Sequence, residues 1–140
     1  MSMRTLVPAM LLALTSGAAL AASGAPAEQH FRAIASADVG HIMQQYADGA
    51  TLQWVGGPLD GTYTGKEQIQ SVWSKFAKAV APTKFKVAYQ LTAADPKGET
   101  VTANVEFEGH ETIKVRYVLV YRQGKLVDEI WQIDPKLHIG

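Results

Sequence analysis

The chain of 140 residues contains 47% hydrophobic and 19% charged residues, which is ordinary for one globular domain that buries a core. Its 13 Lys and Arg are balanced by 13 Asp and Glu, so it lacks the basic surface that nucleic acid or an anionic membrane would require. The absence of cysteine excludes disulfides, thiolate metal ligands and cysteine nucleophiles. We therefore expect no nucleic-acid partner.

The N-terminus has the three-part pattern of a signal peptide. Arg4 precedes a mostly apolar stretch over 5–14, and a run rich in small residues follows. Cleavage after Ala21 fits the small-x-small rule, and cleavage after Ala22 or Ala27 would fit as well. The apolar stretch is too short to span a bilayer. We expect residues 1–21 to be removed and the mature protein to be periplasmic or secreted, without membrane insertion.

Helices are expected first in the mature chain. Apolar residues recur at helical spacing on both sides of Asp38, a good N-cap residue: Ala27, Phe31, Ile34 and Ala35 before it, and Val39, Ile42, Met43 and Tyr46 after it. Residues 51–55 have strand composition and are followed by two glycines. A capping box at Thr64 and Glu67 starts a third helix, which ends before Pro82.

From residue 85 onward the hydrophobic period changes to two, which predicts an antiparallel meander. Apolar residues occupy the odd positions of three segments, 85–91, 101–107 and 113–121. If the apolar faces of these strands coincide, opposite charges meet across them. The expected groups are Lys86, Glu106 and Lys114, and Lys84 with Glu108.

A fourth strand follows Gln123-Gly124, which we interpret as a two-residue hairpin loop. Such a loop couples odd positions of one strand to even positions of the next, so we expect Asp128, Ile130 and Gln132 on the inner face. The outer face then carries Trp131 in an apolar patch with Val118, Val120, Val127 and Ile133. Such a patch is typical of an interface, and we expect a homodimer through it with Trp131 as its anchor.

A family resemblance rests on four segments: Ala37-Asp38, 46–52, 63–69 and 124–127. On these segments the chain resembles the SnoaL-like, polyketide-cyclase-like branch of the NTF2-like superfamily. The resemblance implies one α+β domain over 22–140, a cystatin-like cone in which N-terminal helices pack on a curved antiparallel β-sheet around a pocket. It also implies frequent dimerisation through the outer sheet face. Function does not follow from it, because the superfamily holds isomerases, cyclases, dehydratases and domains without known activity.

The chain departs from the ketosteroid-isomerase branch at the position of the catalytic base. That branch has an Asp a few residues after its Ala-Thr motif, and the matching residue here is Trp54, which cannot take a proton. That branch also has a Tyr donor on its first helix, where this chain has His30.

Asp128 is the leading catalytic candidate. A carboxylate on the inner face beside Tyr117 and Tyr121 would be desolvated, and its pKa would rise toward that of a general acid or base. Tyr117 or His30 would stabilise a developing oxyanion. The alternative is that the register is shifted by one residue and Asp128 lies in solvent near the turn.

Aromatic residues are the candidate pocket lining, because cavities for organic ligands are mostly apolar. The candidates are Trp54, Tyr63, Trp73, Phe76, Tyr121 and Gln132. Core packing alone also explains Trp73 and Phe76. The four histidines have no metal-ligand spacing, and residues 61–67 do not form a phosphate loop, so we expect neither a metal nor another cofactor.

Three functional hypotheses remain. The first is an exported domain that binds a small, largely apolar organic molecule in its cone, which the lack of a complete catalytic set favours. The second is a cyclase or isomerase that uses Asp128. The third is a non-catalytic, dimeric structural or partner-binding domain with a filled cone.

Overall fold

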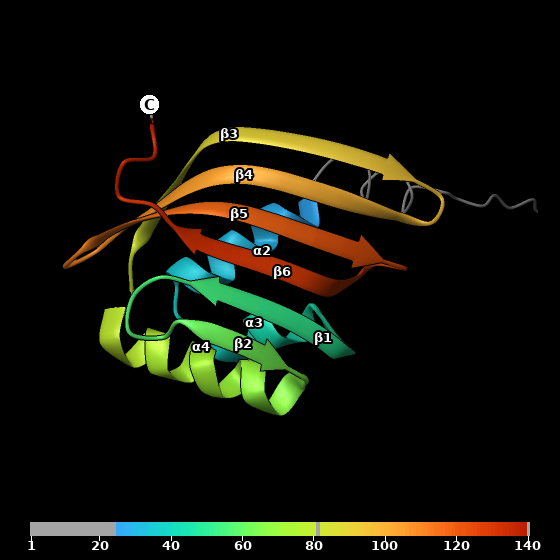
Figure 1. The fold of residues 1–140 in the computed structure, drawn as a ribbon, viewed down its shortest axis with the longest axis horizontal. Coiled ribbons are helices and arrows are strands. Elements are labelled where there is room, and N and C mark those ends of the chain that lie inside the picture. The colour runs from blue at the N-terminus through green and yellow to red at the C-terminus, as the bar shows by residue number, and fades with distance from the viewer. Residues whose placement is uncertain (1–24, 81, 140) are drawn as a thin grey trace, which may run out of the picture.

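The computed structural model describes residues 25–80 and 82–139 (Figure 1). The expected signal segment, residues 1–21, lies outside the described residues. The described helices are α2 (Ala25–Ala35), α3 (Val39–Gln44) and α4 (Lys66–Val80), and none of them is long and apolar enough to cross a membrane. The strands are β1 (Tyr46–Val55), β2 (Gly61–Thr64), β3 (Lys84–Asp95), β4 (Gly98–Glu108), β5 (Thr112–Arg122) and β6 (Lys125–Ile133).

Local capping explains where the second and third of these helices begin. The Asp38 carboxylate accepts a hydrogen bond from the His41 backbone N–H, as expected for the N-cap of α3. At α4 the Thr64 backbone N–H donates to Gln68 Oε1 at 2.9 Å. The helix thus starts near Thr64 as expected, but the side chain that accepts the hydrogen bond from the Thr64 backbone is that of Gln68, where Glu67 was expected.

The strands form one six-stranded sheet in the order β2-β1-β6-β5-β4-β3. Only the β1–β6 pairing is parallel. Figure 1 shows the sheet curving in front of α2, with α4 beside β1 and β2. The expected α+β cone is confirmed. The expected charge pairing is also confirmed, because Glu106 is paired with both Lys86 and Lys114, and Glu108 with Lys84.

A β-bulge in β6 overturns the expected faces of that strand. The two-residue turn is present, since Tyr121 pairs with Leu126, but Val120 then pairs with Asp128. Val127 is therefore an extra residue, and every side chain after it points to the face opposite the expected one. Asp128 and Ile130 are exposed, and Trp131 is fully buried. Placing Asp128, Ile130 and Gln132 on the inner face and Trp131 on the outer face was wrong.

A second irregularity changes the outer half of β3. Val87 pairs with Val105, but Tyr89 pairs with Asn104, so the alternation shifts by one residue between them. Tyr89 and Leu91 consequently lie outside the core, with 46% and 59% of their surface exposed. The expected inner position of these two residues was wrong for the same reason as in β6.

The core lies between the inner face of the sheet and the helices, and it includes three tyrosines, Tyr46, Tyr117 and Tyr121. Their exposed fractions are 0%, 0% and 3%. Burial raises the pKa of all three hydroxyls, and the negative charge of Glu129 raises it further. These phenols keep their protons at a pH where an unfolded chain would lose them.

We predict that this burial makes the fold sensitive to alkali. Above about pH 10 the unfolded chain binds fewer protons than the folded one, so the free energy of unfolding should fall by about 1.4 kcal/mol per pH unit for each tyrosine. Tyr117→Phe removes one of these groups and should make the decline shallower by that amount, measured by urea unfolding between about pH 9 and 11.

The control is Tyr89→Phe, because Tyr89 lies outside the core with 46% of its surface exposed. This variant should keep the wild-type pH dependence. Equal slopes for Tyr117→Phe and the wild type would contradict the burial of the Tyr117 hydroxyl.

Candidate functional site

A buried carboxylate, Glu129, is the centre of a polar cluster inside the cone. Glu129 has 1% of its surface exposed, and His30, Tyr46, Tyr117 and Trp73 around it have none. The cluster joins α2, β1, α4, β5 and β6. Residues so far apart in the chain meet only because the sheet curves over the helices.

The extra residue in β6 places Glu129 at this position. Val127 turns Glu129 and Trp131 toward the helices, and Glu129 pairs with Leu119 while Trp131 pairs with Tyr117. Tyr46, expected at the end of a helical stripe, is instead the first residue of β1. From there its side chain enters the core beside the α2 residue His30, with ring centroids 5.5 Å apart.

The Glu129 carboxylate accepts three hydrogen bonds. Tyr46 donates to Oε1, Tyr117 donates to Oε2, and His30 Nε2 lies 2.9 Å from Oε2. Trp73 Nε1 donates in turn to the Tyr46 hydroxyl at 2.8 Å. Because an ionised carboxylate can only accept hydrogen bonds, His30 Nε2 is the donor in its contact with Glu129. His30 Nδ1 has no hydrogen-bond partner.

The two phenols have a fixed protonation state. Burial, followed by the charge of Glu129, holds the pKa of Tyr46 and of Tyr117 well above the usual value. Both hydroxyls are therefore donors at neutral pH. Carboxylates and imidazoles can act as general acids or bases, and phenols can donate a hydrogen bond to an oxyanion.

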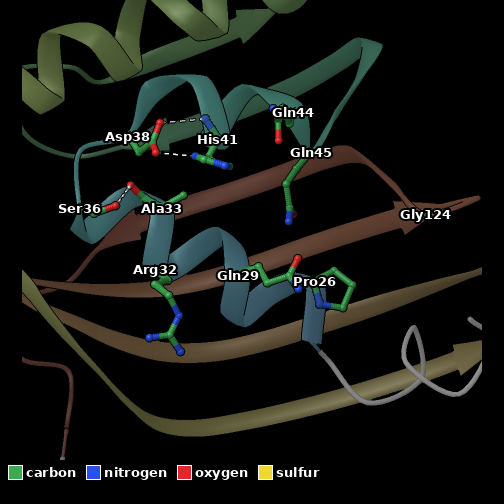
Figure 2. Close-up of a pocket in the computed structure, with 10 residues that line it drawn as sticks. All are labelled: Pro26, Gln29, Arg32, Ala33, Ser36, Asp38, His41, Gln44, Gln45 and Gly124. Atoms are coloured by element: carbon green, nitrogen blue, oxygen red, sulfur yellow. Dashed lines mark hydrogen bonds and ion pairs between the residues drawn. The ribbon is translucent and has the colours of Figure 1, made fainter.

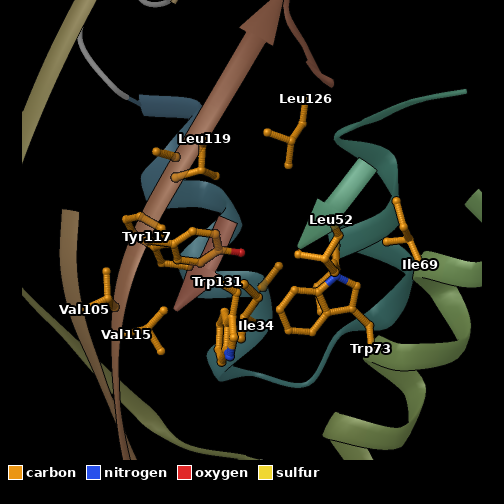
Figure 3. Close-up of a cluster of buried hydrophobic side chains, with 14 of the residues drawn as sticks. Ile34, Leu52, Ile69, Trp73, Val105, Val115, Tyr117, Leu119, Leu126 and Trp131 are labelled. Atoms are coloured by element: carbon orange, nitrogen blue, oxygen red, sulfur yellow. The ribbon is translucent and has the colours of Figure 1, made fainter. Parts of the chain in front are cut away.

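An aromatic layer separates this cluster from the open end of the cone. Trp131 lies at its centre, with ring centroids 5.3 Å from both Tyr117 and Trp73 and 4.6 Å from Trp54. Phe76 and Phe107 complete the contacts around Trp131, both at 5.4 Å. Figure 3 shows Trp131 between Tyr117 and Trp73 in the middle of the core. The polar cluster is sealed from solvent by these rings.

Beyond this layer lies an open cavity of about 510 Å³. It is bounded by the β1–β2 loop, the C-terminal half of α4, the β4–β5 hairpin and the segment after β6. Its lining is mainly apolar and includes Trp54, Leu59, Phe76, Val80, Ile113 and Ile133. Its size and lining suit a small organic molecule.

The expected catalytic residues are only partly brought together. Tyr117 and His30 both contact the Glu129 carboxylate, at 0% exposure. Asp128 is exposed on the outer face, away from both. Glu129 and Tyr46 were not among the site residues expected from the sequence. A signal for Glu129 was present, because Trp131 has the largest side chain of β6 and Trp is highly buried on average, and Glu129 shares the face of Trp131.

The expected pocket residues do not all line the open cavity. Trp54 and Phe76 line the open cavity, and Trp73 lies deeper, bound to Tyr46. Tyr63 donates to the Leu59 carbonyl at 2.6 Å and does not line the cavity.

The last two candidates lie elsewhere. Tyr121 donates to Gln45 at 3.0 Å and lines a different hollow beside the β3–β4 turn. Gln132 lies on the outer face and donates to its neighbour's carbonyl, so its assignment to the inner face was wrong.

A second hollow, of about 550 Å³, lies between α2, α3 and the β5–β6 turn (Figure 2). Its side chains are mostly polar, and the side chains of Asp38 and His41 are hydrogen-bonded on its edge. The hydrogen bond to the His41 side chain is the main cause that lowers the pKa of Asp38. Since the Asp38 carboxylate also caps α3, this pair has a structural role.

Within residues 25–80 and 82–139, no group of three or more His, Asp or Glu side chains could hold a metal ion. The polar cluster brings only one carboxylate and one imidazole together, with phenols in the remaining positions. Phenols that keep their protons are poor metal ligands.

Solved structures share the fold at low sequence identity. An NTF2-like protein of unknown function from Pseudomonas putida KT2440 matches with a TM-score of 0.70 and 19% identity, covering 83% of this chain and 87% of that one. A ketosteroid isomerase-like protein from Erwinia carotovora atroseptica SCRI1043 matches with a TM-score of 0.65 and 16% identity, covering 81% of this chain and 95% of that one. A de novo designed protein with a curved β-sheet matches with a TM-score of 0.63 and 20% identity, covering 80% of this chain and 84% of that one.

These likenesses concern the fold, and the match to a designed protein shows that the cone alone does not indicate an activity. The comparison with curated protein sequences finds no match. The model of the SnoaL-like domain family matches residues 27–129, from the first described helix to the buried carboxylate. The chain therefore belongs to the SnoaL-like domain family of the NTF2-like superfamily.

Proposed function

We propose that the protein binds a small, largely apolar organic molecule in the cavity at the open end of its cone, and that it does so as an exported protein. The observation that carries this proposal is the cavity of about 510 Å³ with a mainly apolar lining. Binding there requires no rearrangement of the sealed polar cluster. Burial of apolar ligand surface against Trp54, Phe76 and Ile133 supplies the driving force.

Ala79→Trp is predicted to abolish binding. Ala79 lines the cavity from an exposed position on α4, so a large ring there should fill the cavity without disturbing the core. In a thermal-shift screen of small aromatic and alicyclic compounds, the wild type should gain melting temperature. At a ligand concentration about 100 times Kd the expected stabilisation is about 2.7 kcal/mol. Ala79→Trp should gain none.

Lys78→Trp is the matched control, because Lys78 is the exposed neighbour on α4 and does not line the cavity. It should respond to compounds as the wild type does. A screen in which no compound stabilises the wild type, or in which Ala79→Trp responds equally, would contradict binding in this cavity.

A second candidate function is proton transfer by Glu129, and the buried cluster favours it. Glu129 replaces Asp128 as the candidate base because it contacts Tyr117 and His30. In an isomerase reaction Glu129 would take the α-proton of a β,γ-unsaturated ketone and return it to the γ-carbon, with Tyr117 donating to the dienolate oxygen. Substrate would reach Glu129 only if the ring of Trp131 moved aside.

Glu129→Gln is predicted to remove such an activity, because the amide cannot take the proton. With a β,γ-unsaturated cyclic ketone as probe and the absorbance of the conjugated product as readout, the rate should fall by about 10²- to 10⁴-fold. Asp128→Asn, the neighbouring exposed acid, should keep the wild-type rate. Equal rates for Glu129→Gln and the wild type, or no turnover by the wild type, would exclude this reaction.

The outer sheet face supports a homodimer, although its anchor differs from the expected one. Ile130 is 40% exposed there and pairs with Val118. Asp128 lies two residues before Ile130 on β6, where it pairs with Val120. Arg116 lies two residues before Val118 on β5, where it pairs with Gln132. Because the strands are antiparallel, Asp128 and Arg116 lie diagonally on opposite sides of the Ile130–Val118 pair. A two-fold axis through the Ile130–Val118 pair would place Asp128 of each copy against Arg116 of the other, so the face is complementary to itself in charge.

Ile130→Glu is predicted to give a folded monomer, because it places a charge at the centre of the interface while leaving the core untouched. Sedimentation velocity should show a dimer for the wild type and for Gln70→Glu, a control on the exposed face of α4. Asp128→Arg should weaken the dimer, and the added change Arg116→Asp should restore it. A monomeric wild type would contradict this assembly.

A further inference from the structure

A second buried carboxyl group, that of Glu99, lies at the end of the cone opposite the open cavity. Glu99 is the second residue of β4, next to the β3–β4 turn, and the hairpin at the other end of β4 bounds that cavity. Figure 1 shows this turn and this hairpin at opposite ends of the sheet. Glu99 shares the inner face of β4 with Val101 and Ala103, and 5% of its surface is exposed. The proposed functions do not use this group.

The Glu99 carboxyl group has no hydrogen-bond partner. Both of its oxygens are buried, and neither is bonded. Glu129 differs, because it accepts hydrogen bonds from Tyr46, Tyr117 and His30. An ionised carboxylate at the position of Glu99 would lose its hydration without compensation. The packing therefore favours the protonated form, and desolvation raises the pKa of Glu99.

The ionisable side chains around the β3–β4 turn do not compensate a charge on Glu99. Tyr121 pairs with Glu99 across β4 and β5, and burial raises the pKa of its hydroxyl, which stays neutral. Lys97 and Arg122 line the hollow beside the turn together with Glu99, but neither is bonded to its carboxyl group. Asp95 accepts hydrogen bonds from two backbone N–H groups of the turn, at 2.8 and 3.2 Å, and is a further negative charge.

The ionisable side chains of α2 and α3, and the lysine that begins β6, are bonded elsewhere. The contacts are Glu28 with Arg32, His30 with Glu129, Asp38 with His41, and Lys125 with the Gln44 carbonyl. In the part of the chain that the structure describes, no cation is therefore bonded to Glu99.

Tyr121 connects this end of the sheet to the helices. Its hydroxyl donates to Gln45 Oε1 at 3.0 Å, and Gln45 is the C-cap residue of α3. Tyr46 follows Gln45 in the chain and donates to the Glu129 carboxylate. A change in the pairing of Glu99 with Tyr121 would therefore act on the connection between the sheet, α3 and the polar cluster.

We propose that Glu99 is a pH-sensitive switch: a neutral Glu99 keeps the β3–β4 end of the sheet packed as in the structure, and an ionised Glu99 turns into solvent and opens the pairing with Tyr121. The switch goes beyond the proposed binding function, because it lies at the other end of the cone and requires no ligand.

The direction of the switch follows from the raised pKa of Glu99. The stabilisation by the neutral group is fully present below 4.5, the usual pKa of glutamate. It is lost as the pH rises through the higher pKa of the folded state. Acid therefore closes this end of the cone, and neutral pH favours its opening.

Amide hydrogen exchange of the wild type and of Glu99→Gln tests the switch, because glutamine has nearly the same shape and cannot ionise. The readout is the ratio of the two exchange rates for the amides at 98–101 and 119–122, since the ratio at one pH cancels the intrinsic pH dependence of exchange. This ratio, wild type to variant, should rise about tenfold or more between about pH 4 and about pH 7.5. The amides at 107–108 and 112–113, at the other end of the same strand pair, should show no such rise.

Glu108→Gln is the control, because it removes the same charge from an exposed position on β4. It should leave the exchange at the Glu99 end as in the wild type at both pH values. A ratio for Glu99→Gln that does not change with pH would overturn the proposal. An equal rise at 107–108 and 112–113 would also overturn it, because the effect would then be global and not a local opening.

A second measurement on the wild type covers the case in which Glu99→Gln does not fold. In a titration followed by NMR, the δ-carbon of Glu99 should titrate at a higher pH than those of the exposed Glu108 and Glu111. The amide resonance of Tyr121 should move in the same step as Glu99. A Glu99 that titrates together with the exposed glutamates, or a Tyr121 amide that does not follow it, would refute the switch.

Discussion

The burial of the Glu129 carboxylate is the constraint on which the rest of the structure depends. A charge without solvent must be satisfied by the protein, and here α2, β1 and β5 each supply one donor. These donors come from residues that are 99, 83 and 12 positions away in the chain. Removing a single partner would leave the carboxylate undersatisfied, so the cluster holds the helices at one position relative to the sheet.

That constraint is met by a single extra residue. Without Val127 in the bulge, strict alternation from the turn would point Asp128 inward and leave Glu129 and Trp131 in solvent. The bulge therefore places both the Glu129 carboxylate and the Trp131 ring inside the core. It also leaves Ile130 on the outer face, where 40% of its surface is exposed. One local irregularity thus determines the inner site and the outer surface.

The sequence was sufficient for the architecture because periodicity and capping are local signals. The Asp38 cap, the two-residue turn and the opposite charges across β3, β4 and β5 are confirmed, and so are the helix stripes except at Tyr46, which begins β1. The site was harder, because a bulge does not alter composition and a shift of one residue exchanges the faces of a strand. Burial of Trp131 was the available evidence, and the aliphatic Ile130 beside it made both registers plausible. Tyr46 was missed because its contact with Glu129 spans 83 residues.

The cone thus contains two layers with opposite chemistry, and Trp131 belongs to both. On one side its ring edge meets Tyr117 and Trp73, which hold the charged cluster, and on the other it contacts Trp54 and Phe76, which line the cavity. A molecule bound in the cavity would be separated from Glu129 by one indole ring. Movement of that ring would break five ring contacts but would expose no new unpaired donor, since Nε1 is already unpaired. The packing of this single side chain therefore separates the open cavity from the Glu129 cluster.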